Sequence, residues 1–174
     1  NATVDDVKAF HKRFYNPNNA TIVIAGDFDI EDTKAMISKY FGEIPAGEAV
    51  EDPQPQHVSL EATKKVFHED NFARAGQLKM IWPTIEQFSD DAYALDYLGA
   101  LISQGKKAPL YKVLEKEKGL SSSYYAYNGS QEITGGFNIV VTANGGKSLK
   151  DVEAAVFEAF DLFEKEGFTE EDVE

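Results

Sequence analysis

Apolar residues recur every three or four positions at the start of the chain, which predicts a helix. Thr3 and Asp6 can form its N-terminal capping box, and its apolar stripe consists of Val4, Val7, Phe10 and Phe14. Residues 20–26 (ATIVIAG) are short and β-branched, as in a buried strand, and Asp29 can cap a second helix that Gly42 ends. Residues 1–45 are therefore expected to be a helix–strand–helix unit. One strand cannot satisfy its own edges, so we expect this unit to pack on the second half in cis or to be exchanged between chains.

A change of composition follows this unit. Residues 46–57 are rich in proline, glycine, alanine and acidic residues, and Pro53 and Pro55 disfavour regular structure. We interpret 46–57 as a linker.

The pattern in residues 58–174 predicts a second domain with strands and helices interleaved. Strands are expected at 64–71, 73–83, 122–128 and 135–144, and helices at 89–103, 109–118 and 148–167. Neighbouring strands with helices between them favour an α+β fold, an antiparallel sheet with helices packed on one face. Thr169 opens a further helix only a few residues before Glu174, and the chain begins without Met, so both ends are expected to be cuts in a longer polypeptide.

The stretch after the helix at 109–118 is the most unusual in composition. Gly119 ends that helix, and three serines, Ser121 to Ser123, lead into a tyrosine-rich strand. Tyr125 and Tyr127 share one face of this strand, whereas Tyr124 lies on the other. This face is either an ordinary half-buried sheet surface or a candidate peptide-contacting surface.

Charge and motif content narrow the function. The net charge of −13 disfavours nucleic acid and anionic membrane surfaces as partners, and no apolar run is long enough to span a membrane. The chain has no Cys, and His68 lacks the second histidine of either zinc-helix pattern because Phe72 stands there. No catalytic or metal-binding residue is therefore assigned. The compartment stays open, whether periplasmic, secreted, cytoplasmic or organellar.

Several separated motifs resemble one protein family. The motifs are FYNPNNATIVIAGD, YFGEIP, ARAGQLKMIWP, APLYKVLEKEKGL and GFTEEDVE, and together they resemble pitrilysin/insulinase-type zinc metallopeptidases and mitochondrial-processing-peptidase-like proteins. The resemblance covers essentially the whole chain in a consistent order. It implies the processing-peptidase-like fold, with 1–45 as the end of a first peptidase-like domain and 58–174 as the first part of a second, inactive one. The zinc-binding half, and with it the zinc, is then expected upstream of residue 1.

The resemblance also marks one pair of positions. Family members that lack zinc often hold the substrate with an Arg and, seven residues later, a Tyr, at the place where Glu115 and Ser122 stand here. A carboxylate cannot donate a hydrogen bond to a peptide carbonyl, so the substrate-holding role is not expected in this chain. The substitution suggests that the parent is the zinc-bearing kind and that a partner subunit supplies the pair.

Two functions follow from the resemblance. The first is a non-catalytic C-terminal segment of a zinc-dependent endopeptidase, which contributes to a peptide-enclosing chamber and to domain or subunit contacts. The alternative is an inactive structural or partner subunit of a peptidase-like assembly. The implied partners are the upstream zinc-binding half, the peptide substrate, and a homo- or heterodimer partner.

Overall fold

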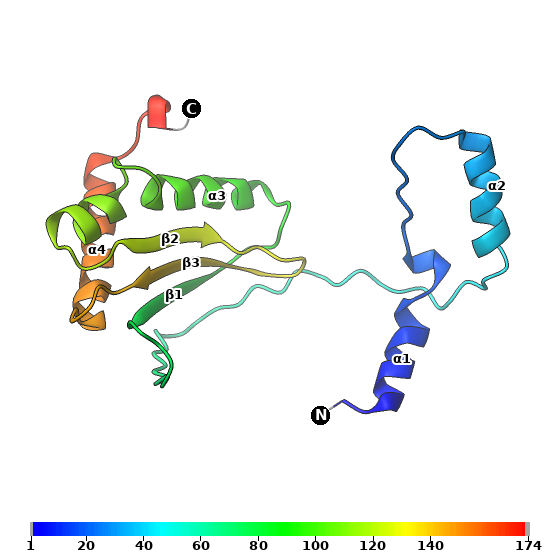
Figure 1. Cartoon of the computed structure of the whole chain (residues 1–174), viewed down its shortest axis with the longest axis horizontal. Helices are drawn as coiled ribbons and strands as arrows, with labels where there is room; N and C mark the ends of the chain where they lie inside the picture. Colours follow the sequence, from blue (N-terminus) through cyan, green and yellow to red (C-terminus); the bar gives the residue numbers. More distant parts are fainter. Residues whose placement is uncertain (1, 173–174) are drawn as a thin grey trace. The chain divides into compact units, whose positions relative to one another are not determined.

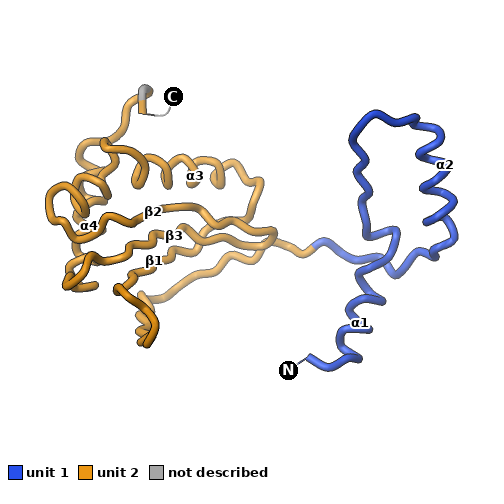
Figure 2. Tube along the Cα trace, in the orientation of Figure 1, with its two compact units in different colours: residues 1–52 blue, residues 53–174 orange. Residues whose placement is uncertain are grey.

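The computed structural model describes residues 2–172 and divides into two compact units. Unit 1 comprises residues 1–52 and unit 2 residues 53–174 (Figure 2). The boundary lies inside the proline-rich stretch, and the backbone N–H of Gln56 already belongs to unit 2, where it donates to the carbonyl of Ile133 at 2.6 Å.

Unit 1 contains the two helices that the sequence predicts. Helix α1 (Val4–Phe14) begins at Thr3, whose hydroxyl and backbone exchange hydrogen bonds with Asp6 in a complete capping box. Helix α2 (Ile30–Phe41) begins at Asp29, whose carboxylate accepts two backbone N–H groups. A short 3₁₀ turn, η1 (Pro17–Asn19), lies between them. None of the described residues of this unit is buried, so its apolar side chains are left at its own surface.

The strand expected at residues 20–26 does not form, and that prediction was wrong. The backbone there has no ladder partner among residues 2–172, and the side chain of Val23 is 85% exposed. β-Branched residues favour an extended backbone, but a strand also needs a neighbour to receive its N–H and C=O groups.

Unit 2 is built around a three-stranded antiparallel sheet (Figure 1). The strands are β1 (Gln77–Thr84), β2 (Ser123–Asn128) and β3 (Gly135–Thr142), in the order β1-β3-β2. Helix α3 (Asp90–Ser103) and the π-helix η2 (Tyr111–Glu117) connect β1 to β2, and α4 (Leu149–Glu166) follows β3. A 3₁₀ turn, η3 (Glu170–Asp172), ends the described chain.

The core of unit 2 lies on one face of this sheet. Alternate strand residues, among them Ala126, Phe137, Ile139 and Val141, are buried together with residues of η2 and α4 such as Leu114 and Val156. Met80 and Trp82 of β1 pack against the same cluster. The strand residues between these, whose side chains point to the other face of the sheet, do not belong to this core. This arrangement confirms the expected α+β fold, an antiparallel sheet with helices on one face.

Three local predictions in unit 2 need correction. Residues 64–71 form no strand, because nothing in the described chain pairs with them and Val66 and Phe67 are exposed. The expected helix at 109–118 is a π-helix, with Lys118 N–H donating to Val113 O at 3.1 Å across five residues, a spacing that apolar periodicity does not distinguish from an α-helix. Strand β1 continues through Pro83 to Thr84, which an edge strand permits.

Candidate functional site

Glu115 and Ser122, the two positions expected to correspond to the family's substrate-holding pair, have structural partners in unit 2. Glu115, on η2, accepts the hydroxyl of Tyr124 at 3.0 Å. Burial, together with the neighbouring Glu115 carboxylate, raises the pKa of Tyr124 to about 12. Ser122 donates to the side-chain oxygen of Asn144 at 3.4 Å. The first contact joins η2 to β2, and the second joins the turn between them to the residues after β3.

The serine that precedes them is fully buried. The hydroxyl of Ser121 lies 2.6 Å from the Thr142 carbonyl, to which it donates, and accepts the backbone N–H of Ser123 at 3.1 Å. It therefore joins the start of β2 to the end of β3. The three-serine run is a loop entering a strand, and its first member is part of the core.

The second candidate surface is the face of the sheet opposite the core. We call it the open sheet face, and it consists of two cross-strand rows: Lys79, Val140 and Tyr125 in one, and Ile81, Asn138 and Tyr127 in the other.

Aromatic and aliphatic side chains dominate the open sheet face. The rings of Tyr125 and Tyr127 are stacked, with centroids 5.8 Å apart and planes 25° apart, and about half of Tyr125 is exposed. Ile81 is 53% exposed, while Val140 and Asn138 are buried between their longer cross-strand neighbours. Exposed stacked tyrosines beside an aliphatic side chain form a surface that can contact an extended peptide.

Sequence reasoning found Tyr125 and Tyr127 but missed Lys79 and Ile81. These two residues join the face only through the register of β1 with β3, which pairs Ile81 with Asn138 more than fifty positions away. The alternation of residues 77–84 indicates which of their side chains share a face. It does not indicate which other strand lies beside them.

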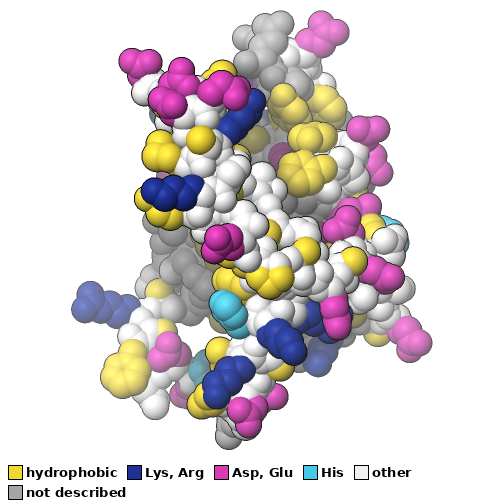
Figure 3. All heavy atoms as spheres, turned by 90° about the vertical axis from the view of Figure 1, so that its right-hand side faces the viewer, with side chains coloured by type: hydrophobic (Ala, Val, Ile, Leu, Met, Phe, Trp, Pro, Cys, Tyr) yellow, Lys and Arg dark blue, Asp and Glu magenta, His cyan; other side chains and the backbone are white. Residues whose placement is uncertain are grey.

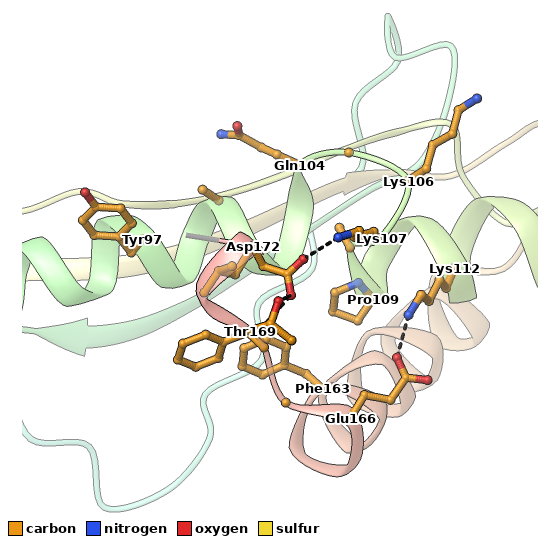
Figure 4. A pocket seen from close by; sticks show the side chains of 16 residues that line it. Tyr97, Gln104, Lys106, Lys107, Pro109, Lys112, Phe163, Glu166, Thr169 and Asp172 are labelled. Carbon is orange, nitrogen blue, oxygen red and sulfur yellow. Dashed lines mark hydrogen bonds and ion pairs between the residues drawn. The ribbon is translucent and has the colours of Figure 1, made fainter. Parts of the chain in front are cut away.

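A pocket of ≈ 650 Å³ lies between the loop after α3 and the end of α4 (Figure 4). Two of its lysines form ion pairs: Lys107 Nζ lies 3.0 Å from Asp172, and Lys112 Nζ lies 2.6 Å from Glu166. The backbone N–H and the hydroxyl of Thr169, with the Lys107 ammonium, lower the pKa of Asp172 to about 2. These two ion pairs tie the residues around α4 and η3 to the loop after α3 and to η2.

The residues needed for zinc chemistry are not brought together. Among residues 2–172, no three His, Cys, Asp or Glu side chains are grouped so that they can hold a metal ion. His11, in unit 1, stacks on Tyr15 with ring centroids 4.8 Å apart. The described residues therefore give a zinc ion no ligand set. None of the described helices is long and apolar enough to cross a membrane.

Comparison with known proteins identifies the family. The sequence matches the family described as Peptidase M16 inactive domain over residues 1–174. It is 27% identical to the zinc protease PqqE of Helicobacter pylori over 95% of this chain and 37% of that protein. It is 26% identical to the mitochondrial presequence protease of Schizosaccharomyces pombe over 98% of this chain and 18% of that protein.

Solved structures share the fold. A protease from Helicobacter pylori superposes with a TM-score of 0.78 and 21% identity over 99% of this chain and 42% of that structure. A peptidase M16 inactive domain from Pseudomonas fluorescens gives 0.76 and 20% over 98% and 41%. The chain thus spans less than half the length of these relatives. From end to end it belongs to the peptidase M16 inactive-domain family.

Proposed function

We propose that this chain is the non-catalytic C-terminal segment of a zinc-dependent endopeptidase. In this proposal it helps to enclose the peptide and contacts the polypeptide that carries the zinc. The match to an inactive M16 domain along the whole chain carries the proposal, and the zinc protease relatives support it. The zinc-binding half of the same protein would lie upstream of residue 1 and would perform the hydrolysis.

The open sheet face supports a role in holding the peptide. Helices cover one face of the sheet, whereas the other presents stacked Tyr125 and Tyr127 beside Ile81. Large exposed aromatic side chains bind peptide backbone and apolar side chains through area and stacking. We assign this face to the inside of the peptide-enclosing chamber.

The apolar surface of unit 1 supports a role in contacts with the upstream half. Both helices are amphipathic, yet Val4, Phe10, Ile30 and Tyr40 are all more than half exposed. Hydrophobic side chains lie at the surface between acidic and basic ones (Figure 3). Apolar patches of this kind mark interaction sites, and we assign this one to the zinc-binding half.

The test uses the full-length protein with peptide substrates. Replacing Tyr125 and Tyr127 together by Ala should raise KM while leaving kcat nearly unchanged, because the lost contacts hold the ground state and the transition state alike. Tyr93, on α3, is a matched control: it is 55% exposed and lies outside the open sheet face, so Tyr93→Ala should leave both constants unchanged.

Two results would count against the proposal. Unchanged KM in the double variant would remove the peptide-holding role of the open sheet face. A full-length protein that binds no zinc and cleaves no peptide would instead indicate an inactive structural or partner subunit of a peptidase-like assembly.

A further inference from the structure

Lys79 carries the one charge on the open sheet face of the described strands. The other five residues of the two cross-strand rows are neutral, and so are the residues that extend this face from the row of Gln77 to the row of Pro83. The chain as a whole has 30 acidic and 17 basic residues. A sheet face with a lysine and no carboxylate therefore has the opposite sign from the rest of the chain.

The ammonium group of Lys79 has no acidic partner among residues 2–172. Other lysines of unit 2 do form ion pairs, and three of their partners, Glu153, Glu158 and Glu166, lie on α4. Helix α4 packs on the core face of the sheet. The carboxylates that neutralise lysines in unit 2 are thus placed on the other side of the sheet from Lys79, and its charge is left to pair with a ligand.

The row that begins with Lys79 ends in an aromatic side chain. Lys79, Val140 and Tyr125 lie side by side on β1, β3 and β2, and Val140 is only 4% exposed although it lies on the face away from the core. Its longer neighbours cover it, so the apolar stem of Lys79 lies along the sheet while the ammonium group reaches solvent. Two strand spacings of about 4.8 Å separate Lys79 from Tyr125, a distance of about 10 Å between their backbones.

We infer that Lys79 selects peptides that carry an acidic side chain two or four residues from an apolar one. The apolar side chain packs on Tyr125 and Tyr127, and the Asp or Glu carboxylate accepts a hydrogen bond from the Lys79 ammonium. An extended peptide rises about 3.3 Å per residue and turns every second side chain to the same side, so two or four residues bracket the distance of about 10 Å. The inference names the substrate class of the open sheet face and rests on the proposed function.

Competition between two peptides, cleaved by the full-length protein, tests the charge preference. Both are acetylated and amidated at their ends, contain one Phe, and differ only in a Glu or a Gln placed two or four residues from it. In a mixture, the ratio of cleavage rates gives the ratio of kcat/KM. The Glu peptide should be preferred by about three- to tenfold, as expected for an ion pair partly shielded from water. Lys79→Met should abolish this preference, and Lys79→Glu should create a preference for a Lys peptide over the Gln peptide.

Lys116→Met is the matched control variant. Lys116 is also exposed, but it lies on η2, which packs on the core face of the sheet, so this variant should keep the preference for the Glu peptide. Equal rates for the Glu and Gln peptides would overturn the inference, and so would a preference that Lys79→Met leaves unchanged. A preference seen only in peptides with a free C-terminal carboxylate would overturn it too, because the anion would then be the peptide terminus.

The tyrosine pair distinguishes this failure from failure of the proposed function. If replacing Tyr125 and Tyr127 by Ala raises KM while the Lys79 variants keep the normal peptide preference, the face holds peptide and only the selection of acidic residues is refuted. If neither set of variants changes KM or the preference, the peptide-holding role of the open sheet face is refuted as well. A full-length protein that cleaves no peptide would refute both.

Discussion

Replacing Ser121 by Ala should destabilise unit 2 although it removes only one oxygen atom. The Ser121 side chain is fully buried, donates to the Thr142 carbonyl at 2.6 Å and accepts the Ser123 N–H at 3.1 Å. The alanine variant leaves both of those backbone groups without this partner. Burying such groups unsatisfied costs more than the bond itself contributes.

The expected loss follows from the cost of leaving a buried backbone group without a partner. An unsatisfied buried donor or acceptor costs about 1–3 kcal/mol, so the free energy of unfolding should fall by about that amount. For a unit of this size, each kcal/mol lowers Tm by roughly 4 °C. The void left by the missing oxygen is too small to add a large cavity term.

Urea unfolding monitored by tryptophan fluorescence measures this loss. Trp82 is the single tryptophan of the chain and packs between Phe137 and Phe160, with ring centroids 6.5 and 5.8 Å away, so its emission reports on unit 2. Ser122→Ala is the matched control, because Ser122 is exposed and makes a bond of 3.4 Å to Asn144. Its free energy of unfolding should stay within about 0.5 kcal/mol of that of the unmodified chain. Equal midpoints for the two variants would refute the reasoning.

Three further predictions concern titration and backbone space. Absorbance titration should show the Tyr124 hydroxyl ionising near pH 12. The stabilisation that this raised pKa represents is complete below pH 10 and is lost as the pH rises towards 12. Glu115→Gln should reverse only part of the rise in the Tyr124 pKa, because burial is the largest cause of that rise. Carbon-detected NMR should show the Asp172 carboxylate titrating near pH 2. The stability from its bonds to Thr169 and Lys107 is then complete above about pH 4 and is lost as the pH falls towards 2. An Asp172 pKa at the usual value for aspartate would contradict this geometry. Gly135→Ala should lower the free energy of unfolding by about 1–3 kcal/mol, because the new Cβ meets the backbone carbonyl of Ile85. Gly145→Ala is the control, because a Cβ there has nothing within 4 Å, and it should leave the free energy of unfolding unchanged. Calorimetry measures both variants.

The helices of this chain could be predicted because their start signals are local. Thr3 with Asp6, Asp29 and Ser148 each lie within three residues of the N–H groups that they cap, and all three cap in the structure. Ser89 stands at the N-cap of the helix expected at 89–103, yet its hydroxyl donates back to the Glu86 carbonyl and caps no N–H group, while α3 still begins after it. A local signal thus marked the start of this helix although the serine makes no capping bond there.

The candidate surface could be predicted only in part. Alternation along β2 placed Tyr125 and Tyr127 on one face, and their stacked rings confirm that the two side chains lie together. The contribution of Ile81 depends on β1 pairing with β3 rather than with β2, its nearer neighbour in the order of strands along the chain. No local pattern specifies which strands become neighbours, because that choice is made by the packing of α3 and α4 on the far face.

The two strand predictions that failed have a common physical cause. Residues 20–26 and 64–71 carry the β-branched and aromatic side chains of strands, and in both segments some of those side chains are more than 80% exposed: Val23 and Phe67. Propensity reports the conformation that a segment prefers, whereas a ladder requires a second segment in register. The three strands that do form find their partners between residues 77 and 142. The failures therefore indicate missing neighbours rather than misread residues, and they match a sheet whose β1 edge is itself unpaired within the described chain.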